Sequence, residues 1–200
     1  MTVTLRIAVG LLACGLLSAA PPTCVTGTLA SYIALGADGC TFDGNVFANF
    51  TYSATVTGGA MAIKPDQILV TPSLIAPETT VFKFSAPWSV ARDQTEDSFI
   101  HYTIVLPCGD TRTAQKELML GTAHVGSIIG SVTVTETTNV GKLSVYDRCT
   151  EVCQSKTVDS FNFNPVSVVL VTDHVSLSGG TGGVSLDEYS ALVNLCYLCP

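Results

Sequence analysis

Cysteine is the residue type in this 200-residue sequence with the most chemical possibilities. The chain ends in Cys196-Tyr-Leu-Cys199-Pro, and a Cys149-x-x-x-Cys153 spacing lies upstream. Four thiolates at these positions could bind zinc in a tetrahedral site. A redox site is disfavoured, because a reactive C-x-x-C usually opens a helix, whose N-terminus lowers the thiol pKa. The third possibility is a set of disulfides, and the compartment decides between it and zinc.

The N-terminus indicates that the protein is exported. It has a basic start, an apolar run over residues 7–17 and a small-residue end, which are the three parts of a secretory signal peptide. We expect cleavage after Ala19 or Ala20, and lipidation of Cys14 is an alternative. The apolar run is too short to cross a bilayer, so no transmembrane helix is expected. The sequence therefore predicts a signal peptide over 1–20 and one mature domain over 21–200.

Export favours disulfides over zinc. We predict a bond between Cys24 and Cys40, which flank the expected first strand in turn-like sequence. We also predict at least one bond from the Cys149–Cys153 loop, or from Cys108, to the C-terminal pair. An odd cysteine is then left free or pairs with another chain. The disulfide candidates are Cys24, Cys40, Cys108, Cys149, Cys153, Cys196 and Cys199.

Carboxylates cluster in two turns. Asp93, Glu96 and Asp97 lie in RDQTED, and Asp38 and Asp43 lie around GADGCTFDGN. Paired carboxylates could cleave a glycoside, and carboxylate oxygens could bind calcium. Neither turn has the spacing of a known calcium loop, so solvated acidic turns are the favoured interpretation.

Nucleophilic catalysis has little support. The chain has three histidines, His101, His124 and His174, and no G-x-S-x-G elbow. Alternation places His101 on the solvent side of its strand. The single tryptophan, Trp88, could bind sugar on a sandwich edge, but large aromatic residues mostly fill cores, and we predict that it is buried. No catalytic, metal or cofactor-binding residue is predicted.

Period-two alternation is the strongest structural signal. FANFTYSATV, FIHYTIVL and SVTVTET alternate apolar and polar residues, and turn-forming residues separate the runs. TLASYIAL (28–35) is also expected to be a strand. These patterns predict an all-β fold with a single antiparallel β-sandwich, Ig-like or jelly-roll-like. SLDE at 185–188 has capping-box spacing, which predicts a short C-terminal helix, with a last strand as the alternative.

The charge balance excludes some partners. Residues 21–200 contain all sixteen acids and eight of the nine bases of the chain. An acidic surface repels nucleic acid and anionic lipid, so neither is an expected partner. Few strands carry Lys, which commonly blocks open sheet edges, and self-association into an oligomer or fibre is therefore expected.

Several motifs, in order, resemble a group of uncharacterised exported bacterial proteins of the PEP-CTERM sorting-domain type. They are LASYIALGADGCTFDGNVFANFTYS (29–53), DQILVTP (66–72), FSAPWSV (84–90), FIHYTI (99–104), VTVTE (132–136) and DSFNFNPVSVVLVTDHVSLSGGTGG (159–183). The resemblance implies a β-sandwich exported by a Gram-negative bacterium that often makes exopolysaccharide, and it implies no activity. The Pro-Glu-Pro motif, apolar helix and basic tail of that group are not in this sequence.

We therefore expect a non-enzymatic protein of the cell surface or extracellular matrix that contacts proteins or surface glycans. The alternative is a secreted hydrolase that acts on polysaccharide with Asp93, Glu96 or Asp97.

Overall fold

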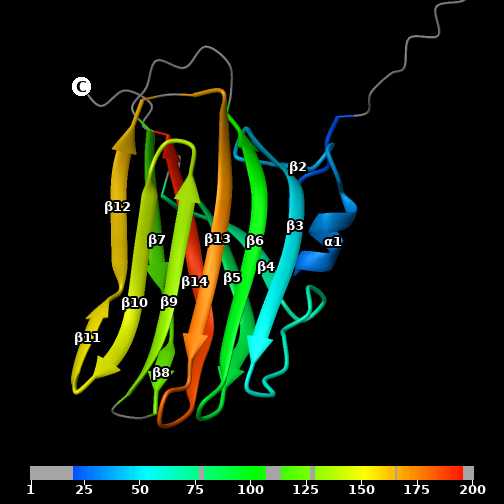
Figure 1. Cartoon of the computed structure of the whole chain (residues 1–200). Coiled ribbons are helices and arrows are strands. Elements are labelled where there is room, and N and C mark those ends of the chain that lie inside the picture. The colour runs from blue at the N-terminus through cyan, green and yellow to red at the C-terminus, as the bar shows by residue number, and fades with distance from the viewer. Residues whose placement is uncertain (1–19, 77–78, 107–113, 127–128, 165, 196–200) are drawn as a thin grey trace, which may run out of the picture.

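A computed structural model describes residues 20–195, except 77–78, 107–113, 127–128 and 165. Residues 1–19 of the predicted signal peptide, including Cys14, lie outside the described residues, as do Cys108, Cys196 and Cys199. Within them, the chain forms two antiparallel sheets that pack face to face, which confirms the predicted β-sandwich (Figure 1). No helix in the described ranges is long and apolar enough to span a bilayer.

The first layer is called the β13 sheet here. Its strands, in spatial order, are β11 (Val152–Lys156), β10 (Lys142–Thr150), β9 (Ile129–Thr138), β13 (Val168–Ser178), β6 (Thr95–Val105), β3 (Asn45–Thr57) and β2 (Cys40–Phe42). The second layer, the β14 sheet, has the order β1 (Gly27–Thr28), β4 (Leu69–Ala76), β5 (Thr79–Val90), β14 (Val184–Leu195), β7 (Ala114–Leu120) and β12 (Val158–Phe163), and β8 (Ala123–Val125) also pairs with β14.

Alternating apolar residues of both sheets fill the space between the layers. In β6, every second side chain from Glu96 to Ile104 is buried, as the alternation of FIHYTIVL predicts. Aromatic rings connect the layers: the Phe47 ring stacks on Phe82 with centroids 4.0 Å apart, and the Phe84 ring lies 6.1 Å from that of Tyr102. Trp88 is completely buried, which confirms its predicted place in the core.

Two elements differ from the sequence-based predictions. The predicted strand at 28–35 is wrong, because residues Leu29–Ala34 form helix α1 beside β3 (Figure 1). Thr28 caps this helix by accepting a hydrogen bond from the Ser31 N–H, at 3.2 Å. The predicted C-terminal helix is also wrong, because the sequence that follows SLDE lies in β14 between β5 and β7, where both strands offer backbone partners.

The disulfides are confirmed in part. Cys24 is bonded to Cys40, as predicted. Cys149 and Cys153 are bonded to each other, because they are directly opposite residues of the β10–β11 hairpin. The predicted bond from this hairpin to the C-terminal pair is therefore wrong, as is a zinc site that includes its thiolates. A bond from Cys108 to that pair lies outside the described residues.

The predicted self-association stays a prediction, although β4 has one feature that favours it. The short strand β1 pairs only with Leu69 and Val70 of β4. Leu74 and Ile75, farther along β4, are 53% and 67% exposed. An exposed apolar stretch beside an open sheet edge is a common site of pairing between chains.

Candidate functional site

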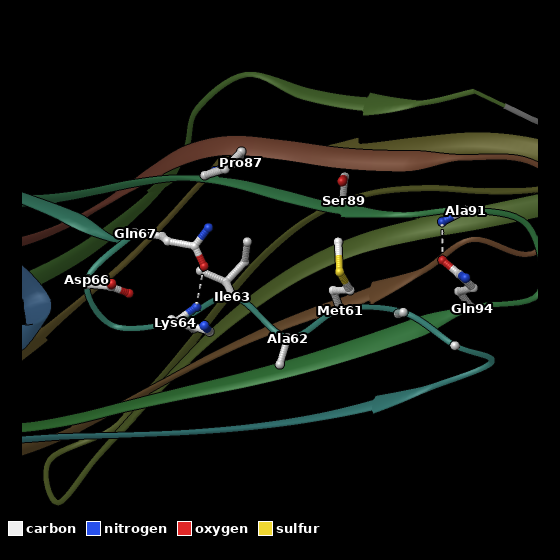
Figure 2. A pocket seen from close by; sticks show the side chains of 12 residues that line it. Met61, Ala62, Ile63, Lys64, Asp66, Gln67, Pro87, Ser89, Ala91 and Gln94 are labelled. Carbon is white, nitrogen blue, oxygen red and sulfur yellow. Dashed lines mark hydrogen bonds between the residues drawn. The ribbon is translucent and has the colours of Figure 1, made fainter.

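A pocket of about 950 Å³ lies between residues 59–67, which connect β3 to β4, and the end of β5 (Figure 2). It exists because β4 and β5 do not pair over their full lengths. Leu69 is opposite Ser85, and β5 continues for five more residues with β14 as its neighbour on the other side. Pro87 lies in this stretch, where its missing N–H leaves no ladder bond unmade. The pocket therefore occupies the place of an absent strand, and we call it the β5 pocket.

Two glutamine side chains fix the walls of the β5 pocket. Gln94 Oε1 accepts a hydrogen bond from the Ala91 N–H at 2.9 Å, and Gln94 Nε2 donates to the Gly58 carbonyl at 3.1 Å. At the other end, Gln67 Oε1 accepts from the Lys64 N–H at 2.9 Å (Figure 2). Each glutamine gives a partner to backbone groups that lie outside the strands.

Ile63 anchors the middle of the connecting segment. Its N–H donates to Glu96 Oε1 at 3.0 Å, and its carbonyl accepts from the Tyr52 hydroxyl at 2.8 Å. Ser98 Oγ donates to the same Glu96 oxygen at 3.2 Å. Burial raises the pKa of Glu96 above its ordinary value, although these two hydrogen bonds oppose that shift. The anchor therefore depends on a buried acid.

Replacing Glu96 by glutamine should stabilise the protein at pH 8 and have little effect at pH 4. A raised carboxyl pKa contributes stability that is present below the unfolded-state pKa and is lost as pH rises through the folded-state value. The glutamine side chain would keep an acceptor for the Ile63 N–H but would not ionise. We expect Glu96→Gln to raise the melting temperature at pH 8 by a few degrees, since about 1 kcal/mol moves a domain of this size by ~2–4 °C.

Thermal unfolding of both proteins at pH 4, 6 and 8 measures this difference directly. The other buried acids are unchanged in the variant, so their contributions to the comparison cancel. Asp187→Asn, which changes an exposed acid on β14, is the matched control. If Glu96→Gln changes the melting temperature equally at pH 4 and pH 8, ionisation of Glu96 does not destabilise the fold and the prediction is contradicted.

The acids singled out from the sequence do not come together. Asp93 is exposed and lies 3.2 Å from Arg92 Nε. Glu96 faces the core, and Asp97 lies on the opposite face of β6. Asp43 Oδ2 accepts a hydrogen bond from Thr80 at 3.5 Å. Of RDQTED, only Gln94 lines the β5 pocket. The described residues contain no group of three His, Cys, Asp or Glu side chains that could hold a metal ion.

Two of the three histidines, His101 and His174, form a ring cluster with Phe99 on the outer face of the β13 sheet. The Phe99 ring lies parallel to His174, with centroids 4.3 Å apart, and its centroid is 6.5 Å from that of His101. His174 Nε2 is 2.7 Å from Asp97 Oδ1, and His101 Nδ1 is 2.9 Å from Thr172 Oγ1. His101 is exposed, as predicted. The carboxylate and threonine partners hold both imidazoles in place.

Sequence reasoning did not identify the pocket residues Lys64, Gln67 and Ser89. They lie in a connection and at a strand end, and no motif marks them. The available signal was the length of the segment between FTYSATV and the next strand, together with its KPDQ turn.

Comparisons with known proteins give remote similarities. No family model matches the sequence, and no curated protein matches it. A solved structure of the enzymatically active domain of tailspike protein 4 from bacteriophage CBA120 is 14% identical, with a TM-score of 0.32. That match covers 74% of this chain, which spans only 20% of the tailspike chain.

Two further similar structures are carbohydrate-binding modules. TmCBM61 in complex with β-1,4-galactotriose is 13% identical, with 70% of this chain and 86% of that chain covered and a TM-score of 0.28. A module described as promiscuous and of the β-sandwich superfamily is 9% identical, with 88% and 62% covered and a TM-score of 0.21.

Proposed function

We propose that this protein is exported to the cell surface or extracellular matrix, where it acts by binding rather than by catalysis, and that the β5 pocket binds glycan. The observation that carries the proposal is the mixed lining of this pocket. Lys64, Asp66 and Ser89 offer hydrogen-bonding groups, and Met61 and Pro87 offer apolar surface between them (Figure 2). A few polar groups on an apolar lining are typical of ligand sites.

The polar groups match the chemistry of a sugar. Sugar hydroxyls both donate and accept, and sugar C–H groups form apolar faces. The Lys64 ammonium donates, the Asp66 carboxylate accepts and the Ser89 hydroxyl does both. Gln67 Nε2 remains available as a donor, because the backbone bond engages only Oε1. Met61, 86% exposed, offers the largest apolar side chain.

The lining favours binding over hydrolysis. A glycosidase of the usual kind needs two carboxyl groups that flank the scissile bond, about 5–9.5 Å apart. Asp66 is the only carboxylate among the lining residues of the β5 pocket. The alternative hydrolase would need a second acid there, and Asp93 and Glu96 are not in the lining.

Export has support from the two disulfides. Cys24–Cys40 and Cys149–Cys153 are of a kind that persists in oxidising compartments. Immunoblotting of washed cells and culture medium, with a cytosolic marker as control, tests this part of the proposal. A protein retained with the cytosolic marker and isolated with reduced cysteines would contradict it.

The glycan part is tested with the oxidised mature protein on an array of neutral and acidic oligosaccharides, followed by calorimetry with any bound sugar. Lys64→Ala and Asp66→Ala should each weaken binding about tenfold, because a hydrogen bond to a charged group contributes roughly 1.5–3 kcal/mol. Lys142→Ala is the matched control, since Lys142 is an exposed lysine on β10, in the other sheet.

Two results would count against the pocket as the glycan site. One is the absence of binding to any polysaccharide or oligosaccharide of the panel. The other is sugar binding that Lys64→Ala and Asp66→Ala leave unchanged, particularly if a change at His101 in the ring cluster abolishes it.

A further inference from the structure

A lysine and two carboxylic acids meet in the middle of the sandwich. Lys116 projects inward from β7 of the β14 sheet, whereas Glu136 on β9 and Asp173 on β13 project inward from the opposite sheet. All three residues are fully buried. Charged side chains in a dry core lose their hydration, so such a cluster is costly unless every group is paired.

The amine and the nearer carboxyl group are in direct contact. Lys116 Nζ lies 3.0 Å from Glu136 Oε2. Yet neither Nζ nor either Glu136 oxygen has a hydrogen bond of acceptable geometry within the described residues. The amine therefore sits against the carboxyl group without being held as a hydrogen-bond donor. Glu136 Cδ, the carbon that the amine would attack, is one bond away from Oε2, so the two reacting groups are already in contact.

Asp173 is placed beside this contact. It is the residue directly opposite Glu136 on the neighbouring strand. Side chains of directly opposite residues have Cβ atoms about 4.5–5.5 Å apart. The Tyr189 hydroxyl donates to Asp173 Oδ2 at 3.1 Å, and Oδ1 has no partner among the described residues. One oxygen of Asp173 is thus fixed, and the other is left for exchange of a proton with its neighbours.

The surroundings favour the uncharged forms of the two acids. Burial raises the pKa of Asp173 well above its ordinary value, and the nearby Glu136 carboxylate raises it further. Burial also raises the pKa of Glu136, against the opposing effect of Lys116. An ammonium–carboxylate pair and a neutral amine–acid pair differ only in the position of one proton. The buried rings of Tyr102 and Tyr189 lie near both acids and keep water away from that proton.

We propose that Lys116 and Glu136 form an intramolecular amide bond that joins the two sheets, with Asp173 as the group that carries protons. The neutral Lys116 amine attacks Glu136 Cδ, and a tetrahedral intermediate forms. Asp173, as the protonated acid, gives its proton to the departing hydroxyl and receives one from the nitrogen, so that it ends in the form in which it began. One C–N bond forms, one C–O bond breaks and one water leaves. Nothing is oxidised or reduced, and no co-reactant is needed.

Two physical effects drive this condensation, which free amines and acids in water do not undergo. The fold holds the nitrogen against the carbonyl group, and such effective concentrations in intramolecular reactions reach about 10⁵–10⁸ M. The reaction also replaces a buried, incompletely bonded pair by a neutral amide. A retained ion pair is the alternative, and it differs from the amide in mass.

The mass of the intact protein tests the proposal. The mature protein is fully reduced and unfolded, so that disulfides do not contribute, and its mass is compared with that of its sequence. We expect a deficit of about 18 Da, which is one water, and a proteolytic fragment in which the Lys116 and Glu136 peptides are joined. An undiminished mass in protein that was folded before denaturation would overturn the proposal.

Amide-for-acid substitutions identify the reacting carbon. Glu136→Gln would form the same amide but release ammonia, so the deficit should change to about 17 Da. Asp173→Asn should retain the full mass or react much more slowly, because the proton carrier is lost. A 17 Da deficit in Asp173→Asn, with the cross-linked peptide joined through position 173, would overturn the assigned roles. If either variant fails to fold, the wild-type mass and peptide map still decide the question.

Discussion

Replacing Trp88 by alanine should lower the free energy of unfolding by about 3–5 kcal/mol, as expected when a buried tryptophan is truncated. Trp88 is completely buried, and its ring centroid is 5.9 Å from that of Tyr189 on the adjacent strand β14. Its neighbours Pro87 and Ser89 point the other way and line the β5 pocket (Figure 2). The cavity left by the missing indole ring would therefore lie directly behind the wall of the β5 pocket. Urea unfolding followed by circular dichroism measures the loss.

Trp88→Phe is the matched control for this prediction. It keeps an aromatic ring in the core and removes the indole Nε1–H, which is buried without a partner in the described part of the chain. Loss of an unsatisfied buried donor is favourable by about 1–3 kcal/mol, which offsets part of the lost packing. We expect Trp88→Phe to cost less than half as much as Trp88→Ala. Equal losses in both variants would show that packing of the ring is not what stabilises this position.

The strands of the core could be predicted because their alternation is unbroken. β6 and β9 each alternate over nearly their whole length, and a one-residue shift would expose every apolar side chain. The segment at 28–35 has no such alternation. Leu29 and Tyr32 are its buried residues, three apart, which is the spacing of a helix face. A run of mixed apolar residues this short suits either structure, and packing against β3 decided it.

The β5 pocket could not be predicted, because it arises from where the pairing of β4 with β5 stops, and single-sequence patterns do not give that register. The buried charges did leave a signal. In AQKELML, Lys116 falls on the same alternating face as Leu118 and Leu120, and Asp173 falls on the face of Val171 and Val175. A charged residue among the buried, alternating positions of a strand indicates an interior site. Glu136 occupies such a position in SVTVTET.

Removing the Cys24–Cys40 disulfide, with serine at both positions, should reduce the free energy of unfolding by about 3 kcal/mol. The chain-entropy estimate for a loop of this length gives that value, because the bond restricts the unfolded chain. Both cysteines are buried in the hydrophobic core, so the hydroxyls add a desolvation cost. Chemical unfolding of the oxidised wild type and the double variant measures the difference.

Cys149→Ser with Cys153→Ser is the matched control. This bond closes a loop with a sequence separation of 4, against 16 for Cys24–Cys40. The same estimate gives about 2 kcal/mol for the shorter loop. We therefore expect the first pair to stabilise the fold more than the second. A larger loss from the hairpin pair would contradict the entropic account for this protein.

The two pairs should also differ in their effect on the β5 pocket. Cys24 and Cys40 flank α1, whose Leu29 N–H donates to the Ile68 carbonyl at 2.8 Å and whose Ala30 N–H donates to the Pro65 carbonyl at 3.0 Å. Residues 65–68 lie at the β4 end of the segment that connects β3 to β4 and lines the pocket, so α1 holds that end in place. Loss of Cys24–Cys40 should speed amide hydrogen exchange at residues 63–68, whereas loss of Cys149–Cys153 should leave it unchanged. Equal exchange in both variants would mean that Gln67, Glu96 and Tyr52 fix the segment that connects β3 to β4. The disulfide that flanks α1 would then contribute nothing to it.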